Sequence, residues 1–145
     1  MIIAIDGPAG SGKSTVAKIV AKKLNFRYID TGSMYRSIAW KSLQKNTALE
    51  DKEAVANIAF KTKIELVSSE SGQLVFIDDE NITDQLKMEI ISRGAAIVAA
   101  QPIIREIMTT KQRQLGKQGK VVMDGRDIGT VVFPQADKKF FLDAD

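Results

Sequence analysis

The residues best suited to chemistry lie near the start of the chain, in a glycine-rich segment that ends in a lysine and two hydroxyl side chains. The segment fits the pattern G-x-x-x-x-G-K-[ST], and an apolar run precedes it. In such a loop the backbone amides and the next helix bind a polyphosphate, the lysine reaches the β- and γ-phosphates, and the first hydroxyl binds Mg²⁺. We therefore expect phosphate contacts from Gly7, Pro8, Ala9, Gly10, Ser11, Gly12, Lys13, Ser14 and Thr15, catalysis by Lys13 and a metal ligand in Ser14. The alternative is a glycine-rich turn with a solvated lysine.

A second polar group, Asp124-Gly125-Arg126-Asp127, follows the apolar run Val121-Val122-Met123. Asp124 is a candidate partner for Mg²⁺, which needs only one or two protein oxygens in addition to phosphates. The alternative is an ordinary turn aspartate of an Asp-Gly pair. The presence of Arg126 and Asp127 in the same loop favours the functional interpretation.

Three arginines are candidates for phosphate binding, because the planar guanidinium group donates two parallel charged hydrogen bonds. They are Arg36, Arg105 and Arg126. Arg36 lies one helical turn after Gly32-Ser33 and can turn back toward a phosphate there. Its alternative role is that of a solvated arginine on a helix surface.

Strand and helix patterns alternate along most of the chain, which predicts an α/β fold with a parallel sheet and helices on both faces. Ligands of such folds bind at the carboxyl ends of the strands. Gly7, Thr31 and Asp124 each follow a strand end, so we expect them to meet at one edge of the sheet. The expected strands are 2–6, 26–29, 121–123 and 139–143, and the expected helices are 13–24, 33–44, 51–60, 84–100 and 102–116.

Local signals refine these boundaries. Asn25 is expected to end the first helix, and Ser33 and Asp51 are expected to cap the second and third. Pro102 suits the first turn of the last helix. The apolar spacing of the first helix predicts one buried face, made of Val16, Ile19, Val20 and Leu24.

One segment departs from the alternation of strands and helices. Residues 63–67 and 73–77 have strand character and flank the polar loop 68–72, so they predict an antiparallel hairpin with a five-residue loop. The hairpin interrupts the alternating order and is expected to be an insertion. We therefore predict one domain over residues 1–145, with an inserted subdomain at about 61–100.

Composition narrows the chemistry further. The 145 residues include no histidine and no cysteine, and the formal net charge is +3. Catalysis is therefore expected to use Lys, Arg, Asp, Glu, hydroxyl groups and a bound ion. The charge is too small to indicate nucleic-acid binding, no apolar run has the length of a membrane span, and the N-terminus does not resemble a signal peptide.

Three runs of sequence resemble the bacterial-type cytidylate kinases. They are GPAGSGKST at 7–15, IDTGSMYR at 29–36 and MDGRDIGTVVFPQA at 123–136, and the similarity covers essentially the whole chain. The resemblance implies the three-layer α/β fold of phosphate-loop NTPases and a monophosphate-binding insertion at the hairpin. It also implies transfer of the γ-phosphoryl group of ATP to CMP or dCMP, with Mg²⁺ as cofactor.

The resemblance also assigns roles by position. Thr31 and Arg36 would hold the monophosphate, Arg126 would bind the acceptor phosphate, and Asp127 and Arg105 would read the cytosine edge. Catalysis would fall to Lys13, Asp124 and Arg126, and the metal to Ser14 and Asp124. The family continues past the last strand with an arginine-rich lid and a tail, so we expect this chain to lack them and to turn over slowly.

Three alternatives stay open at this point. One is another phosphate-loop kinase of small molecules, acting on adenylate, shikimate or dephospho-coenzyme A. Another is a regulatory GTP-binding switch, although neither Asn-Lys-x-Asp nor Asp-x-x-Gly occurs in the sequence. The third is a nucleotide-binding fragment that is non-catalytic or has little activity. For the kinase we expect a cytoplasmic monomer whose partners are CMP or dCMP and ATP, with no nucleic acid and no membrane.

Overall fold

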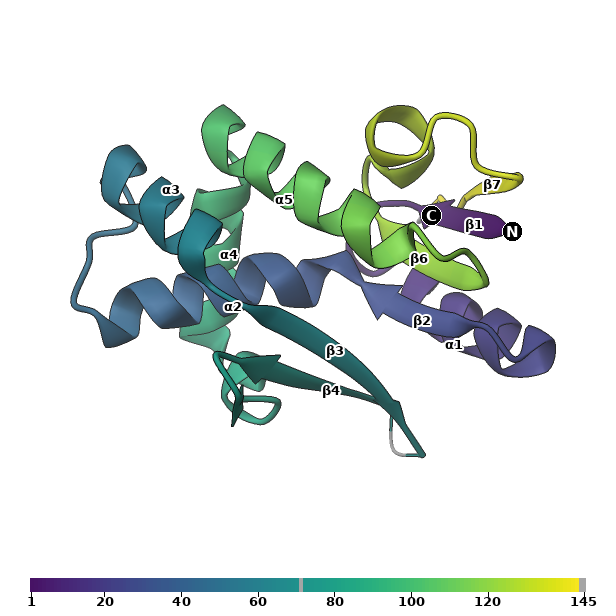
Figure 1. Ribbon diagram of the computed structural model, residues 1–145, viewed down its shortest axis with the longest axis horizontal. Helices are drawn as coiled ribbons and strands as arrows, with labels where there is room; N and C mark the ends of the chain where they lie inside the picture. Colours follow the sequence, from purple (N-terminus) through teal and green to yellow (C-terminus); the bar gives the residue numbers. More distant parts are fainter. Residues whose placement is uncertain (71, 144–145) are drawn as a thin grey trace. The chain divides into compact units, whose positions relative to one another are not determined.

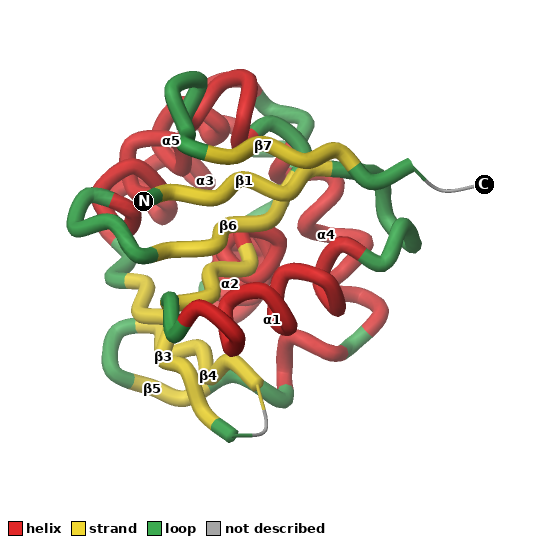
Figure 2. Tube along the Cα trace, turned by 90° about the vertical axis from the view of Figure 1, so that its right-hand side faces the viewer, coloured by secondary structure: helices red, strands yellow, loops and turns green. Residues whose placement is uncertain are grey.

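Four parallel strands form the central sheet (Figures 1 and 2). They are β1 (Ile2–Asp6), β2 (Arg27–Asp30), β6 (Val121–Gly125) and β7 (Lys138–Phe141), and they pair in the order β2-β6-β1-β7. The structure is a computed structural model that describes residues 1–70 and 72–143. The sheet belongs to the first of two units, which contains Met1–Thr31 and the chain from Thr109 onward.

The two inner strands of the sheet are covered on both faces. Val121, Val122 and Met123 of β6 are consecutive and fully buried, as expected for a parallel strand that is packed on both sides. On one face, Ile3, Ile5 and Val122 form a cluster with Ala17 and Ala21 of α1 (Lys13–Leu24). The predicted parallel sheet flanked by helices is therefore confirmed.

Helix α1 begins and ends where the sequence predicts, but of the predicted apolar face only Val20 packs against the core. Asn25 ends the helix in the left-handed conformation, with φ of 57°. The residues that the helix buries completely are Ala17 and Ala21, whereas Val16, Ile19 and Leu24 are exposed. The small alanine side chains let the helix lie close to the sheet, so tertiary packing, and not apolar spacing, selects the face.

The second unit, Gly32–Met108, is mostly helical and carries a small antiparallel sheet. Trp40 of α2 (Thr31–Gln44) packs in one cluster with Val75, Ile77, Ile82 and Ile91. This unit includes the predicted insertion at about 61–100, which stays a prediction. Its elements are α2 (Thr31–Gln44), α3 (Lys52–Lys61), β3 (Ile64–Ser69), β4 (Gly72–Ile77), β5 (Glu80–Asn81), η1 (Gln85–Lys87), α4 (Glu89–Ala99) and the first part of α5 (Pro102–Gly116).

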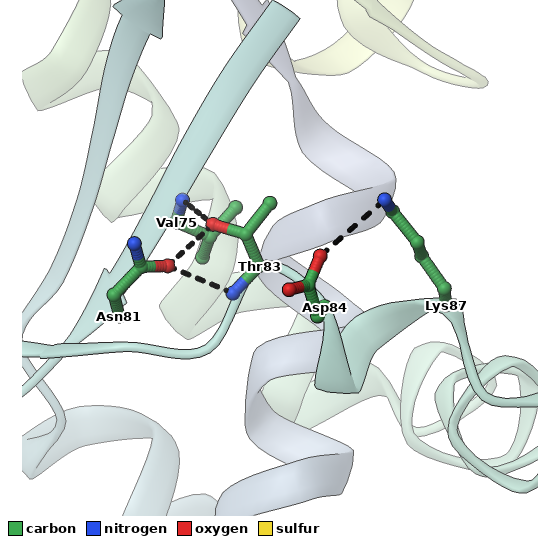
Figure 3. A network of polar contacts seen from close by, with 5 residues as sticks. All are labelled: Val75, Asn81, Thr83, Asp84 and Lys87. Carbon is green, nitrogen blue, oxygen red and sulfur yellow. Dashed lines mark hydrogen bonds and ion pairs between the residues drawn. The ribbon is translucent and has the colours of Figure 1, made fainter. Parts of the chain in front are cut away.

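A polar network organises the turn that follows the small sheet, and Figure 3 shows its five residues. The Asn81 carboxamide oxygen accepts from the Thr83 amide at 3.1 Å and from the Thr83 hydroxyl at 2.6 Å. The same hydroxyl oxygen accepts from the Val75 amide of β4 at 2.9 Å. Asp84 and Lys87 add an exposed ion pair at 3.4 Å. These bonds join the end of the small sheet to η1.

Three further expectations about the second unit need correction. The hairpin strands are longer than predicted, so the loop between β3 and β4 is shorter than five residues, and β5 adds a third strand. The helical stretch expected over 84–100 is broken at Met88, whose extended backbone separates η1 from α4. Helix α2 starts at Thr31, directly after β2, so Ser33 lies inside it and is not its cap.

Other boundaries agree more closely. Asp51 caps α3 and accepts from the Ala54 amide at 3.3 Å, as predicted. Helix α5 covers the expected range. In the first unit, β6 extends to Gly125, which pairs with Asp6 of β1, and the π-helical turn η2 (Ile128–Val132) is not predicted by the sequence. Among the described residues, no helix is both long enough and apolar enough to cross a membrane.

Candidate functional site

The phosphate loop joins β1 to α1 in the first unit. Gly10 and Gly12 have φ of 77° and 83°, in the left-handed region, and a Cβ atom at either position would meet nothing within 4 Å. These glycines therefore serve the backbone conformation, and the space beside them is open to a ligand. The Nζ of Lys13 donates to the Pro8 carbonyl, near the start of the loop, at 3.2 Å. The positive φ of these glycines agrees with the sequence pattern, and phosphate binding by the loop stays a prediction.

Close packing explains the first glycine of the loop. A Cβ atom at Gly7 would collide with the carbonyl oxygen of Leu142, the residue after β7, and would lie 2.9 Å from the Ser11 hydroxyl. The Gly7 amide donates to the Gly125 carbonyl at 3.2 Å. The phosphate loop and the loop after β6 therefore start side by side at the carboxyl ends of their strands, as predicted.

Three polar side chains from different segments meet beside the phosphate loop. The Tyr28 hydroxyl of β2 donates to Asp124 Oδ2 of β6 at 2.7 Å and lies 3.4 Å from the Ser14 hydroxyl. The sequence predicted Ser14 and Asp124 as metal ligands but did not point to Tyr28. Its position in a short apolar strand identifies it only as a strand former, because its partner is 96 residues away.

Burial dominates the electrostatics of this group. Burial first, and then the charge of the nearby Asp30, raise the pKa of Asp124 to about 7, while the hydrogen bond from Tyr28 acts in the opposite direction. Burial also raises the pKa of Tyr28 well above its ordinary value, and the charges of Asp30 and Asp124 contribute. Tyr28 is therefore a neutral donor. A cation would favour the ionised form of Asp124.

The donor atoms of this group fit Mg²⁺. A hydroxyl from Ser14 and a carboxylate from Asp124 are hard oxygen ligands, and Mg²⁺ commonly takes one or two such groups with phosphates and water. The third polar group, Tyr28, orients the carboxylate. We keep the metal site as a proposal that rests on this donor chemistry.

Thr31 lies against the loop that follows β6. Its hydroxyl is buried and donates to the Asp124 carbonyl at 2.8 Å. A Cβ atom at Gly125 would lie 2.5 Å from the Thr31 hydroxyl and 2.9 Å from Ile128, so the glycine permits this contact. Because the hydroxyl proton of Thr31 is already used, any bond from Thr31 to a phosphate is expected to come from the backbone.

Arg126 and Asp127 follow immediately in the same unit. Arg126 is exposed and Asp127 is half-buried, at the edge where Gly7, Thr31 and Asp124 meet. This placement agrees with their predicted contact with a substrate, which stays a prediction. The two remaining candidates lie in the second unit: Arg36 donates to the Ser33 hydroxyl at 2.9 Å, and Arg105 donates to the Ala99 carbonyl at 3.2 Å.

Asp6 is a second residue that sequence reasoning missed. It is the last residue of β1 and was treated only as the end of a strand. Its side chain is buried, and each carboxylate oxygen accepts a backbone amide of η2 at 2.8 Å. The only sequence signal is an aspartate at the end of an otherwise apolar strand, next to the phosphate loop.

Comparisons with known proteins agree with this geometry. A family model described as cytidylate kinase matches residues 3–145. A cytidylate kinase of Geobacillus sp. (strain WCH70) is 53% identical over 142 residues, which cover 98% of this chain and 63% of that protein. Cytidylate kinases of Caldanaerobacter subterraneus subsp. tengcongensis and Bacillus subtilis (strain 168) are 52% and 51% identical, over 98% and 97% of this chain and 62% of each relative. The chain spans less than two thirds of the length of these relatives. It belongs to the cytidylate kinase family.

Proposed function

We propose that this chain carries the nucleotide-binding core of a kinase that transfers the γ-phosphoryl group of ATP to CMP or dCMP. The observation that carries the proposal is the meeting of the phosphate loop with the Asp124–Asp127 loop at one sheet edge, where the Gly7 amide bonds the Gly125 carbonyl. Family membership and the names of the relatives support the same reaction. The products are ADP and CDP or dCDP.

The phosphate loop has the parts needed to bind the ATP phosphates. The amides of the loop and the N-terminus of α1 provide donors and positive potential, and Lys13 provides a full charge that can reach the β- and γ-phosphates. Ser14 and Asp124 would hold Mg²⁺, which spreads the negative charge of the β- and γ-phosphates. The Tyr28 hydroxyl, which donates to Asp124 and lies near the Ser14 hydroxyl, would help to orient this carboxylate. These residues position the phosphates and stabilise their charge.

The acceptor would bind next to this loop. An oxygen of the CMP phosphate attacks the γ-phosphorus, and the bond from that phosphorus to the bridging oxygen of ADP breaks. Arg126 would neutralise the acceptor phosphate, and Asp127 would accept hydrogen bonds from the cytosine edge. Thr31 and Arg36 would contribute to the monophosphate site, and Arg105 to base recognition. Such a reaction needs positioning and charge stabilisation and no catalytic histidine.

An acceptor panel tests the proposal. Formation of ADP from ATP is measured with CMP, dCMP, UMP and AMP, with Lys13→Ala as the matched variant. We expect turnover with CMP or dCMP to exceed that with AMP, and the variant to lose about 10²-fold or more, because the phosphates lose a preorganised charge. Binding of ATP with Mg²⁺, measured by calorimetry, should weaken in the same variant. Equal rates for wild type and variant would refute the phosphate-loop assignment, and preference for AMP would identify a different acceptor.

A further inference from the structure

The two amides at the start of η2 are bound by a side chain that is distant in sequence. The Ile128 amide donates to Asp6 Oδ1 and the Gly129 amide donates to Asp6 Oδ2, each at 2.8 Å, across separations of 122 and 123 residues. The first amides of a helical turn have no partner within the turn and are usually capped by the residue just before it. Here that residue is Asp127, and its side chain makes no capping bond.

The carboxylate of Asp6 therefore takes the place of a local cap. An aspartate suits this role because its two oxygens accept two amides at once, whereas an asparagine would present one acceptor and one donor. The backbone of Asp127 is also fixed from the other side, since its carbonyl accepts from the amides of Val131 and Val132 at 2.9 and 3.1 Å. The backbone of Asp127 is thus held through its carbonyl, and the first amides of η2 are capped by Asp6.

The backbone of Asp6 does not depend on this side chain. Asp6 pairs with Gly125 of β6 and with Phe141 of β7, and its carbonyl accepts from the Leu142 amide at 2.8 Å. A substitution of the side chain should therefore leave β1, and with it the start of the phosphate loop, in place. Its direct effect falls on η2 and on the two residues before it, Arg126 and Asp127.

We propose that Asp6 is a positioning residue that caps η2 and thereby holds Arg126 and Asp127 in the conformation that binds the acceptor nucleotide. The inference rests on the proposed function, because that proposal assigns the acceptor to this loop. Asp6 acts through the loop and touches neither substrate. Its loss should weaken binding of the acceptor more than binding of ATP, because only a fraction of the molecules would then hold the loop in the competent conformation.

The test compares Asp6→Asn and Asp6→Ala with wild type by calorimetric binding of CMP and, separately, of a non-hydrolysable ATP analogue with Mg²⁺. We expect Asp6→Ala to raise the dissociation constant of CMP about tenfold, as loss of two buried hydrogen bonds implies, while the value for the ATP analogue changes less than about twofold. Asp6→Asn should lie between wild type and Asp6→Ala. Hydrogen exchange of the Ile128 and Gly129 amides, measured by NMR, should accelerate in the same order.

Asp137→Asn is the matched control. Asp137 also accepts a backbone amide, that of Ile2 at 2.7 Å, but at the opposite end of β1. The Asp137→Asn variant should leave the affinity for CMP unchanged. Unchanged CMP affinity in both Asp6 variants, or equal weakening for CMP and the ATP analogue, would overturn the positioning role of Asp6 and leave the proposed function standing. Wild-type protein that binds the ATP analogue but not CMP would overturn the proposed acceptor, and the positioning role with it.

Discussion

Gly125 shows how one residue without a side chain permits a contact between two motifs. The Thr31 hydroxyl lies where a Cβ atom at this position would be and donates to the Asp124 carbonyl. The backbone conformation does not require a glycine here, because Gly125 is not among the glycines with positive φ. The requirement is steric, and it links the end of β2 to the loop after β6.

We predict that Gly125→Ala lowers the free energy of unfolding by about 1–3 kcal/mol, the usual cost of forcing an extra methyl group into a packed site. It should also weaken CMP binding, because the Thr31 hydroxyl must move away from Asp124. Unfolding in denaturant and calorimetric binding measure the two effects. Gly129→Ala is the milder control, since its Cβ atom would first meet the flexible Lys139 side chain, at 3.2 Å. Equal destabilisation by both variants would contradict the steric argument.

At the scale of elements, the turn between β4 and β5 depends on two aspartates. Asp78 and Asp79 both have positive φ, 47° and 70°, as the two-residue hairpin turns that match strand twist require. Asp78 does more than turn the chain. Its carboxylate accepts from the Lys63 amide at 3.0 Å and pairs with Lys41 at 3.1 Å. The bond from the Lys63 amide, assisted by Lys41, holds the pKa of Asp78 below its ordinary value of 3.8.

This lowered pKa predicts a pH dependence of stability. A carboxylate with a lower pKa in the folded state stabilises the fold above its ordinary pKa, and that contribution is lost as the pH falls from there through the lowered pKa of the folded state. Asp78→Asn should therefore destabilise the protein at pH 7 by about 0.5 kcal/mol, the scale of an exposed ion pair. The difference from wild type should shrink at about pH 3, below the ordinary pKa of 3.8, where the unfolded chain binds the proton more readily. Denaturant unfolding at the two pH values measures it.

Asp79→Asn is the control for this prediction, because asparagine tolerates the left-handed conformation as well as aspartate does. Asp79 contributes an exposed ion pair with Lys63 at 3.2 Å, and Lys63 also pairs with Glu65 at 3.4 Å. Its replacement should cost less at pH 7 than the Asp78 change. A pH-independent effect of Asp78→Asn would show that the charge of Asp78 does not stabilise the turn.

At the scale of the whole molecule, the chain aligns with 61–63% of the length of its first seven curated relatives. The resemblance places an arginine-rich lid in the part of the relatives that follows the aligned region. An arginine that stabilises the transferring phosphoryl group contributes about 10³- to 10⁵-fold to the rate of this class of reaction. We propose that the described part of this chain binds the nucleotides and that a lid of this kind speeds the transfer.

A chimaera tests this expectation. We predict that joining residues 1–143 to the remaining part of the Bacillus subtilis relative, which is 51% identical, raises the rate of CDP formation by about 10³-fold or more over that of this chain alone. Affinity for ATP with Mg²⁺ should change much less, because the phosphate loop is common to both. The same chimaera with Lys13→Ala controls for activity that does not use this loop. Equal rates for the chain and the chimaera would show that the lid is not needed.

The sequence by itself determined the features that depend on neighbours along the chain. The phosphate loop, the limits of α1 and its end at Asn25, the cap at Asp51 and the parallel α/β class all follow from spacing within a few residues or from the order of elements. The convergence of Gly7, Thr31 and Asp124 also followed, because parallel strands bring their carboxyl ends to one edge.

Only the tertiary structure decided the contacts between segments that are far apart in the chain. Tyr28 with Asp124, and Asp6 with Ile128 and Gly129, join residues separated by about a hundred positions, and no local pattern specifies such pairs. The same reason explains the buried face of α1, where packing on the sheet selects small alanines over larger apolar residues. Local spacing fixes which elements form, and the way that they pack fixes which side chains meet at the site.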